Sequence, residues 1–441
     1  MSLVGQIFRA GELRRRLLFT LGMLAVYRVG IFVTTPGVDR NVMRKIVQDQ
    51  SGTFLGMFNL FSGGALEQLS IFALGIMPYV SASIILQLMG VVFQPLAELR
   101  KEGEAGQRKI NQYTRYGTVL ISLFQAFGLS YVLEGLNAQS QFGSVVVDAG
   151  PMFRLLTVVS LTTGTCFLMW LGEQIQEKGI GNGISLIIFA GIVADLPSGM
   201  RQLYSQMVIG EIQPVTMLAV VFIVLILVAV VVFFERGQRR LPIQYARRSA
   251  GTGVTTGGQV SHLPLKVNAS GVIPPIFASS LLMFPMTLQN IDVPGMSWLL
   301  ELLVPGNWAY TFVFGGLIIF FCFFYTAVTF QPVEVAENLK KQGAFVPGLR
   351  PGKATAEYID YVVTRLTAGG ALYVAAVCVL PTLVQSELRV PFYLGGTSLM
   401  IVVGVALDTV QQAEAHLITQ RYENIGGRSA ERRLSGRKAD A

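Results

Sequence analysis

Residues 57–88 read MFNLFSGGALEQLSIFALGIMPYVSASIILQL. The stretch from Phe58 to Ser70 is apolar but too short to cross a bilayer, and Gly63-Gly64 interrupts it. It continues into a longer apolar run, close to the about 20 residues that a membrane-spanning helix needs. Short broken apolar segments at membrane depth persist only where protein or a water-filled cavity surrounds them. The alternative is an interfacial helix on the outer surface, and the pattern leaves both open.

One face of the longer run carries a distinct pattern. Ile76, Val80, Ser83 and Gln87 recur at helical spacing, so at about 100° per residue they share one narrow helix face. A wet cavity that narrows to an apolar constriction would produce this order, because water and dissolved ions leave such constrictions readily. Ordinary packing, with Ser83 and Gln87 hydrogen-bonded to a neighbouring helix, explains the same pattern.

The rest of the chain has the composition of a membrane protein. Only 14% of its 441 residues are charged, against about a quarter in soluble domains. We predict an all-α membrane protein with ten transmembrane helices in two pseudo-symmetric five-helix halves around a central pore. The expected spans are 17–33, 70–93, 117–133, 154–172, 184–199, 215–234, 270–288, 309–330, 368–385 and 394–412. The first five belong to residues 1–200 and the last five to residues 201–441.

The basic residues predict the orientation. Most of the 34 lysines and arginines fall in alternate connections that include both ends of the chain. Lys and Arg accumulate in cytoplasmic loops, so both termini are expected in the cytoplasm. Two of these connections, 235–269 and 331–367, are longer than membrane topology requires. Long loops are often functional, although a solvated hairpin that only fixes orientation remains the alternative.

The residues offer little for catalysis. His262 lies in a loop and His416 at the end of the last span, so no Ser–His or His–carboxylate constellation occurs within the spans. No phosphate-binding G-x-x-x-x-G-K-[ST] loop occurs. Arg28 and Asp408 lie near span ends without an evident buried partner. We therefore expect a passive conduit, not an enzyme, with no cofactor and no metal. A secondary transporter of a small solute is the alternative, and it would need a midplane charge or a broken helix in each half.

Several long motifs resemble one family. The segment Met57–Leu88 is similar to the second-helix signature of the SecY family, and nearly the whole chain follows the family pattern in order. The other matching motifs are RKINQYTRYGT from Arg108, LGEQIQEKGIGNGISLIIFAGIV from Leu171, HLPLKVNASGVIPPIFASS from His262, QGAFVPGLRPG from Gln342 and YLGGTSLMIVVGVALD from Tyr393.

The resemblance implies a set of site residues. It implies two halves clamped around an hourglass pore, with a plug in the outer funnel and a lateral gate between spans two and seven. The plug segment is 58–70, and the family's plug matches the stretch Phe61–Leu74. The implied pore ring is Ile76, Val80, Ile188, Ile276 and Ile401, with Ile184 as an alternative to Ile188. The implied plug residues are Phe61, Ser62, Gly63, Gly64, Ala65 and Leu66; the gate residues are Ser83, Gln87 and Ser279; the partner-docking residues are Arg350, Arg247, Arg248 and Lys340.

The resemblance also implies a function. It is that of a channel in the bacterial cytoplasmic membrane that passes unfolded secretory proteins and releases apolar segments sideways into lipid. The driving force would come from a partner ATPase or the ribosome. Implied partners are SecE-like and SecG-like small membrane subunits, the SecA ATPase, the ribosome, signal-bearing preproteins, SecDF and a YidC-like insertase.

Overall fold

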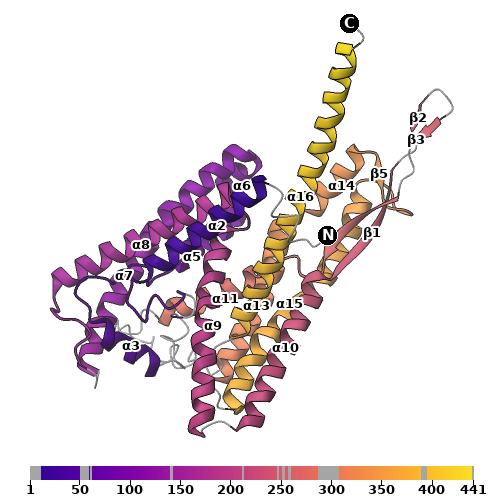
Figure 1. Ribbon diagram of the computed structural model, residues 1–441. Helices are drawn as coiled ribbons and strands as arrows, with labels where there is room; N and C mark the ends of the chain where they lie inside the picture. The colour runs from indigo at the N-terminus through magenta and orange to yellow at the C-terminus, as the bar shows by residue number, and fades with distance from the viewer. Residues whose placement is uncertain are drawn as a thin grey trace.

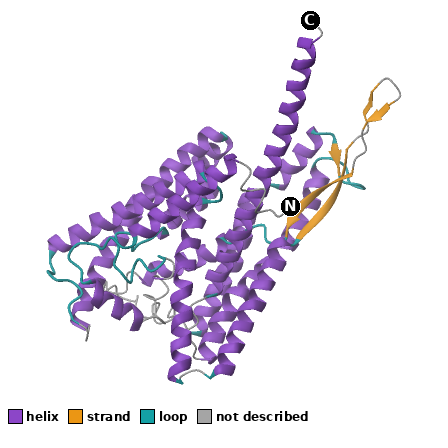
Figure 2. Cartoon of the chain, viewed as in Figure 1, coloured by secondary structure: helices purple, strands orange, loops and turns teal. Residues whose placement is uncertain are grey.

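The computed structural model describes residues 11–49, 59, 62–139, 143–210, 213–245, 248–250, 254–256, 260–286, 307–388 and 395–439. Within these residues the chain is mostly helical (Figures 1 and 2). Its first helices are α2 (Gly11–Gly30), α3 (Arg40–Asp49), α5 (Met77–Val92), α6 (Gln94–Lys101), α7 (Glu104–Gln139), α8 (Pro151–Lys178) and α9 (Gly183–Ile209). The later helices are α10 (Pro214–Arg236), α11 (Ile273–Met286), α13 (Trp308–Thr329), α14 (Pro332–Lys341), α15 (Lys353–Leu388) and α16 (Gly396–Ala439).

The helices form two sets that follow chain order. In Figure 1 the indigo and violet helices α2, α5, α7 and α8 lie to the left, and α10, α13, α15 and α16 lie to the right. Helix α9 belongs with the first set and α11 with the second, and both lie at the boundary between the two. Contacts between the sets include α5 against α11 and α9 against α16. Residue 200, the predicted end of the first half, lies inside α9.

Each of the ten predicted spans overlaps a helix. Six described helices are long and apolar enough to cross a membrane, or seven if the bent pair α5 and α6 forms one span. Large apolar side chains on their outer faces, such as Leu218, Phe233 and Phe312, are about three-quarters exposed. Such a surface is unfavourable in water and ordinary in lipid. The chain is therefore a multi-pass membrane protein.

Local sequence signals set the helix ends. Proline occupies one of the first two positions of α5, α8, α10 and α14, where its missing N–H leaves no helical hydrogen bond unmade. The Asn182 side chain caps α9 by accepting from the backbone N–H groups of Ile184 and Ser185. Gly210 ends α9 in a left-handed conformation, φ 85°, which glycine adopts without steric cost.

The second predicted span is shorter than expected. Residues 62–76 form a series of turns, and α5 begins only at Met77. At its other end α5 meets α6 with a bend of 101°. The prediction of one helix over 70–93 was therefore wrong at its beginning, because Gly75 adopts φ 57°, a conformation that breaks a right-handed helix.

The two long loops contain β-structure, so the all-α prediction was wrong for them. Strand β1 (Gln238–Tyr245) pairs antiparallel with β4 (Val260–Lys266) and with β5 (Ala344–Phe345), in the order β4-β1-β5. A second hairpin pairs β2 (Arg248–Ala250) with β3 (Val254–Thr256). Because β5 comes from the second loop, the two loops share one sheet. That sheet packs on α14 and α15 through a small apolar core around Leu241, Ile243 and Ile359.

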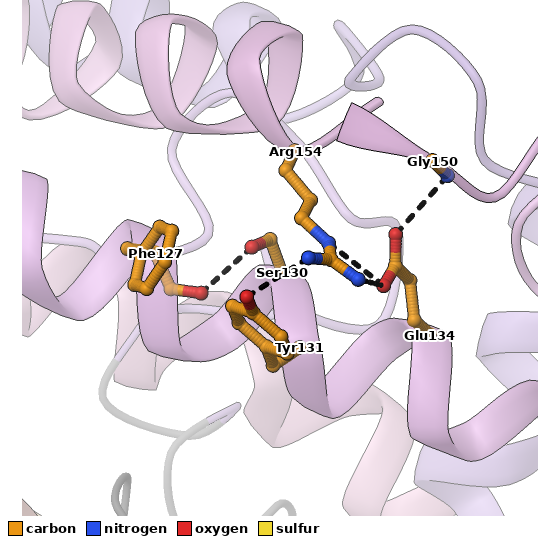
Figure 3. A network of polar contacts seen from close by, with 6 residues as sticks. All are labelled: Phe127, Ser130, Tyr131, Glu134, Gly150 and Arg154. Carbon is orange, nitrogen blue, oxygen red and sulfur yellow. Dashed lines mark hydrogen bonds and ion pairs between the residues drawn. The ribbon is translucent and has the colours of Figure 1, made fainter. Parts of the chain in front are cut away.

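A polar network connects α7 to α8 (Figure 3). Arg154 donates to the Glu134 carboxylate at 2.6 and 2.9 Å and to the Tyr131 hydroxyl at 2.8 Å. Its guanidinium also lies over the Tyr131 ring, 4.1 Å from the centroid. The other Glu134 oxygen accepts from the Gly150 backbone N–H. These contacts fix the turn between the two helices, so α7 and α8 pack as one unit.

Helix α16 joins the two sets at one end of the bundle. The Gln412 side chain accepts from the Gly181 backbone N–H at 3.0 Å, beside a small cluster of Leu13, Ile180 and Ala413. On the other side, Lys266 forms an ion pair with Asp408 at 3.7 Å. The sequence showed no evident buried partner for Asp408; the partner that β4 brings to it, Lys266, is about half exposed.

Candidate functional site

Five predicted ring residues come from four helices and are all buried. Val80, Ile188, Ile276 and Ile401 lie on α5, α9, α11 and α16, and Ile76 is the residue before α5. None is more than 7% exposed, and Ile401 is fully buried. All five belong to one large apolar core that includes residues of both helix sets. The backbone N–H of Val80 donates to the Ile76 carbonyl, so the two side chains share a helix face, as the spacing predicted.

The alternative ring residue, Ile184, has a different environment. It is half-buried, and its Cγ1 lies 3.2 Å from the position that a Cβ on Gly172 would occupy. Ile184 therefore packs against α8 and against the edge of the central core, whereas Ile188, one turn further along α9, is buried within that core.

The described part of the plug segment is folded and buried. Ala65 and Leu66 are fully buried, and Ser62 is 3% exposed; Phe61 lies outside the described residues. Asn59 organises the chain here: its carbonyl accepts from Gly64 N–H at 2.9 Å, and its side chain accepts from Glu67 N–H at 2.8 Å. Gly63 and Gly64 have φ of 66° and 81°, values that favour glycine. Residues 62–66 are thus surrounded by protein and do not form an interfacial helix.

Helix α2 holds this segment through backbone atoms. The Tyr27 hydroxyl donates to the Ser62 carbonyl at 3.1 Å, and Arg28 donates to the Gly63 carbonyl at 2.8 Å. The sequence suggested that Arg28 had no buried partner; its partner is the Gly63 carbonyl of the predicted plug segment. A third residue, Asp195 on α9, was missed, although it is the one acidic residue in the predicted span 184–199. Its carboxylate lies beside Gly64.

The predicted gate residues lie on two helices that contact each other. Helices α5 and α11 meet where the Ser280 hydroxyl donates to the Met77 sulfur at 3.8 Å. Ser279, next to it, is buried and donates to the Ile276 carbonyl of its own helix. Ser83 and Gln87 are half-buried and hydrogen-bond to each other at 3.1 Å. Met77 and Ser280 thus make a direct contact between α5 and α11. The sequence did not predict this contact.

The predicted docking residues lie around the shared sheet. Arg350 is exposed in the turn between β5 and α15, and its carbonyl accepts from the Thr355 hydroxyl. Lys340 is exposed near the end of α14. Arg248 is in strand β2, and Arg247 lies outside the described residues. A shallow hollow of about 330 Å³ on the sheet is lined by Gln238, Arg240, His262 and Pro264.

These features define a class: a multi-pass helical membrane protein whose two helix sets meet around a buried apolar centre, with a folded segment packed against it. A family model described as SecY matches residues 70–410. The chain is 52% identical over 419 residues to the protein translocase subunit SecY of Escherichia coli K12, covering 94% of each chain. It is 51% identical over 434 residues to the SecY of Vibrio cholerae, covering 96% of each.

Solved structures show the same fold. A protein-conducting channel superimposes with a TM-score of 0.65 at 16% identity, covering 94% of this chain and 97% of that chain. Sec61 in a canine ribosome–channel complex from the endoplasmic reticulum gives a TM-score of 0.61 at 15% identity, covering 94% and 97%. The chain belongs to the SecY family of protein translocase subunits.

Proposed function

We propose that this chain forms the protein-conducting channel of a bacterial translocase, and that unfolded secretory proteins pass between its two helix sets. The observation that carries the proposal is the buried apolar centre to which α5, α9, α11 and α16 each contribute. An apolar constriction excludes ions because water leaves it readily. A flexible polypeptide can still pass, because the constriction has no fixed charge that would bind it. Ile76, Val80, Ile188, Ile276 and Ile401 form the ring.

The proposal includes ten spans in two halves, with both termini in the cytoplasm. The overlap of ten apolar blocks with helices supports the number. The concentration of Lys and Arg in alternate connections supports the orientation. In this orientation the plug segment faces the outer funnel, and the shared sheet, α14 and Arg350 face the cytoplasm. Exposed basic residues there suit the docking of a ribosome or a motor ATPase, whose surfaces supply phosphates or carboxylates. Small SecE-like and SecG-like subunits complete the channel.

Contact with a translocating chain tests the central claim. A photo-crosslinkable residue at Ile188 or Ile401 should label a secretory precursor that is arrested part-way across the membrane. The same probe at Phe222, which is 62% exposed on the outer face of α10, serves as the lipid-facing control. Equal labelling from Phe222 and the ring positions would contradict the assignment of the pore ring. Labelling from neither ring position would also contradict it and would favour a translocation path elsewhere.

The lateral gate gives a separate prediction. An apolar segment of about 20 residues is stable in hydrocarbon, so it needs an exit from the pore into lipid. We expect that exit between α5 and α11, where Met77 meets Ser280. Cysteines at these two positions, joined by a short bifunctional thiol reagent, should block membrane insertion of a signal-anchor segment. The native cysteines Cys166, Cys322 and Cys378 are first replaced by alanine.

The control pair for the gate joins helices within one set. Ala82 on α5 and Gly117 on α7 are neighbours, since a Cβ on Gly117 would lie 3.4 Å from the Ala82 Cβ. Cysteines there, joined by the same reagent, should leave insertion unchanged. Normal insertion through a channel fully linked between residues 77 and 280 would place the exit elsewhere.

A further inference from the structure

The closed position of the plug segment depends on contacts to its backbone. Tyr27 and Arg28, adjacent on α2, donate to the carbonyls of adjacent plug residues, Ser62 at 3.1 Å and Gly63 at 2.8 Å. Tyr27 is only 3% exposed and Ser62 is equally buried, so water does not readily replace these bonds. A cationic donor makes a hydrogen bond roughly twice as strong as a neutral one. Arg28 is therefore the stronger of the two contacts.

Helix α9 forms the other wall of this contact. A Cβ on Gly63 would lie 2.5 Å from the Cα of Gly191 and 2.8 Å from the Tyr27 hydroxyl. A Cβ on Gly191 would lie 3.0 Å from the Gly63 Cα. The plug backbone and the α9 backbone thus touch with no side chain between them. Gly63, Gly191 and the Tyr27 hydroxyl therefore meet at one point.

Asp195 lies one turn beyond Gly191 on the same helix. Its Oδ1 is 3.3 Å from the position that a Cβ on Gly64 would occupy. The Asp195 carboxylate and the Arg28 guanidinium also interact through their opposite charges. An Arg charge at membrane depth is costly unless a partner offsets it. The Asp195 carboxylate offsets part of that charge at longer range than a direct ion pair, from its place beside Gly64.

We propose that Tyr27, Arg28 and Asp195 form a latch that positions the plug segment in the resting channel. Arg28 is the main donor to the plug, Tyr27 adds a neutral bond, and Asp195 acts through Arg28 by offsetting its charge. The proposal rests on the assignment of residues 58–70 as the plug. Because the latch grips carbonyl oxygens, it does not depend on plug side chains. Because it consists of hydrogen bonds, water can take them over when the plug leaves.

Thiol accessibility measures plug position directly. A cysteine replaces Ala65, which is fully buried in the closed plug, in a chain whose native cysteines are changed to alanine. The full channel complex is reconstituted in vesicles and treated with a membrane-impermeant maleimide. Arg28→Gln should speed labelling of residue 65 about tenfold, equivalent to about 1.4 kcal/mol. Tyr27→Phe should give a smaller increase, since it removes a neutral bond.

The role of Asp195 is separated by a double-mutant cycle. Asp195→Asn should speed labelling when Arg28 is present and add nothing to Arg28→Gln, because it acts through that side chain. The matched controls Arg40→Gln and Asp148→Asn change exposed charges outside the proposed latch and should have no effect. A reporter cysteine at Ala126, fully buried on α7, must stay protected in every variant.

The outcomes separate the latch from the plug function. Faster labelling at residue 65 with raised resting ion conductance supports both. Faster labelling with unchanged conductance supports the latch and overturns the sealing role of the plug. Unchanged labelling in Arg28→Gln overturns the latch, whatever the conductance. Equal acceleration at residues 65 and 126 also overturns it, since that pattern means general loosening. Additive effects of Arg28→Gln and Asp195→Asn would remove Asp195 from the latch.

Discussion

Aspartate in place of Ile401 should make the resting channel leak ions. Ile401 is fully buried in the apolar core to which the other ring residues belong. A carboxylate there cannot stay dry, because the cost of an unpaired buried charge is several kcal/mol, so water enters with it. We expect ion conductance of unoccupied channels in planar bilayers to rise roughly tenfold or more, the equivalent of at least about 1.4 kcal/mol in the wetting equilibrium.

Three further variants make this result interpretable. Ile401→Leu keeps the volume and the apolar surface, so it should conduct like the parent chain. Ile401→Asn adds polarity without charge and should fall between the two. Ile188→Asp, on α9, repeats the test from a different helix, in case one substitution alone prevents folding. Parental conductance in both folded aspartate variants would mean that these residues form ordinary core packing and that the constriction lies elsewhere.

The ring shows what helical periodicity can and cannot predict. The shared face of Ile76 and Val80 follows from their spacing, and the Val80-to-Ile76 backbone hydrogen bond agrees with it. The inclusion of Ile188, Ile276 and Ile401 does not follow from spacing, because they lie on three other helices. Only resemblance to a known family could supply them. Burial in a common core depends on the tertiary fold, which a short stretch of sequence does not determine.

The plug segment was harder to predict from its own residues. The pattern around Gly63-Gly64 suited an interfacial helix and a buried broken segment equally. The decisive contacts come from Tyr27, Arg28 and Gly191, which are 35 or more residues away in sequence. Arg28 had no evident buried partner in the sequence, because its partner is a backbone carbonyl, and every residue type carries one.

The sheet was missed for a similar reason. In β1 the buried residues Leu241 and Ile243 alternate with exposed neighbours, which is the strand pattern. The basic residues around them were interpreted only as signals of membrane orientation. Strand β5 has only two residues, too few for any periodicity. Its pairing joins two loops about a hundred residues apart in sequence, so the surface that the two loops share exists only in the fold.

That common surface leads to the second prediction of large effect. Arg350→Glu should sharply reduce ATP-driven export of a model precursor into reconstituted vesicles, by about tenfold or more if a charge-assisted contact of 1.5–3 kcal/mol is lost. Arg350 is exposed in a turn between Gly348 and Gly352, whose φ values are 83° and 110°. Side-chain-bearing residues rarely adopt such values, so the turn is defined by its glycines. The turn follows β5, the strand through which the second loop joins the shared sheet.

The competing explanation is that Arg350 is one topology charge among many. In that case its loss is tolerated, because the remaining basic residues on the same side keep the orientation. Lys353→Glu is the matched control: it makes the same charge change three residues away, at the exposed start of α15. We expect Lys353→Glu to export nearly normally, and both variants to reach parental abundance and topology. Arg350→Lys should be intermediate, because a lysine keeps the charge and loses the planar fork that binds carboxylate or phosphate through two bonds. Export by Arg350→Glu at the parental rate would make Arg350 a topology charge and move the docking role to Arg247, Arg248 or Lys340.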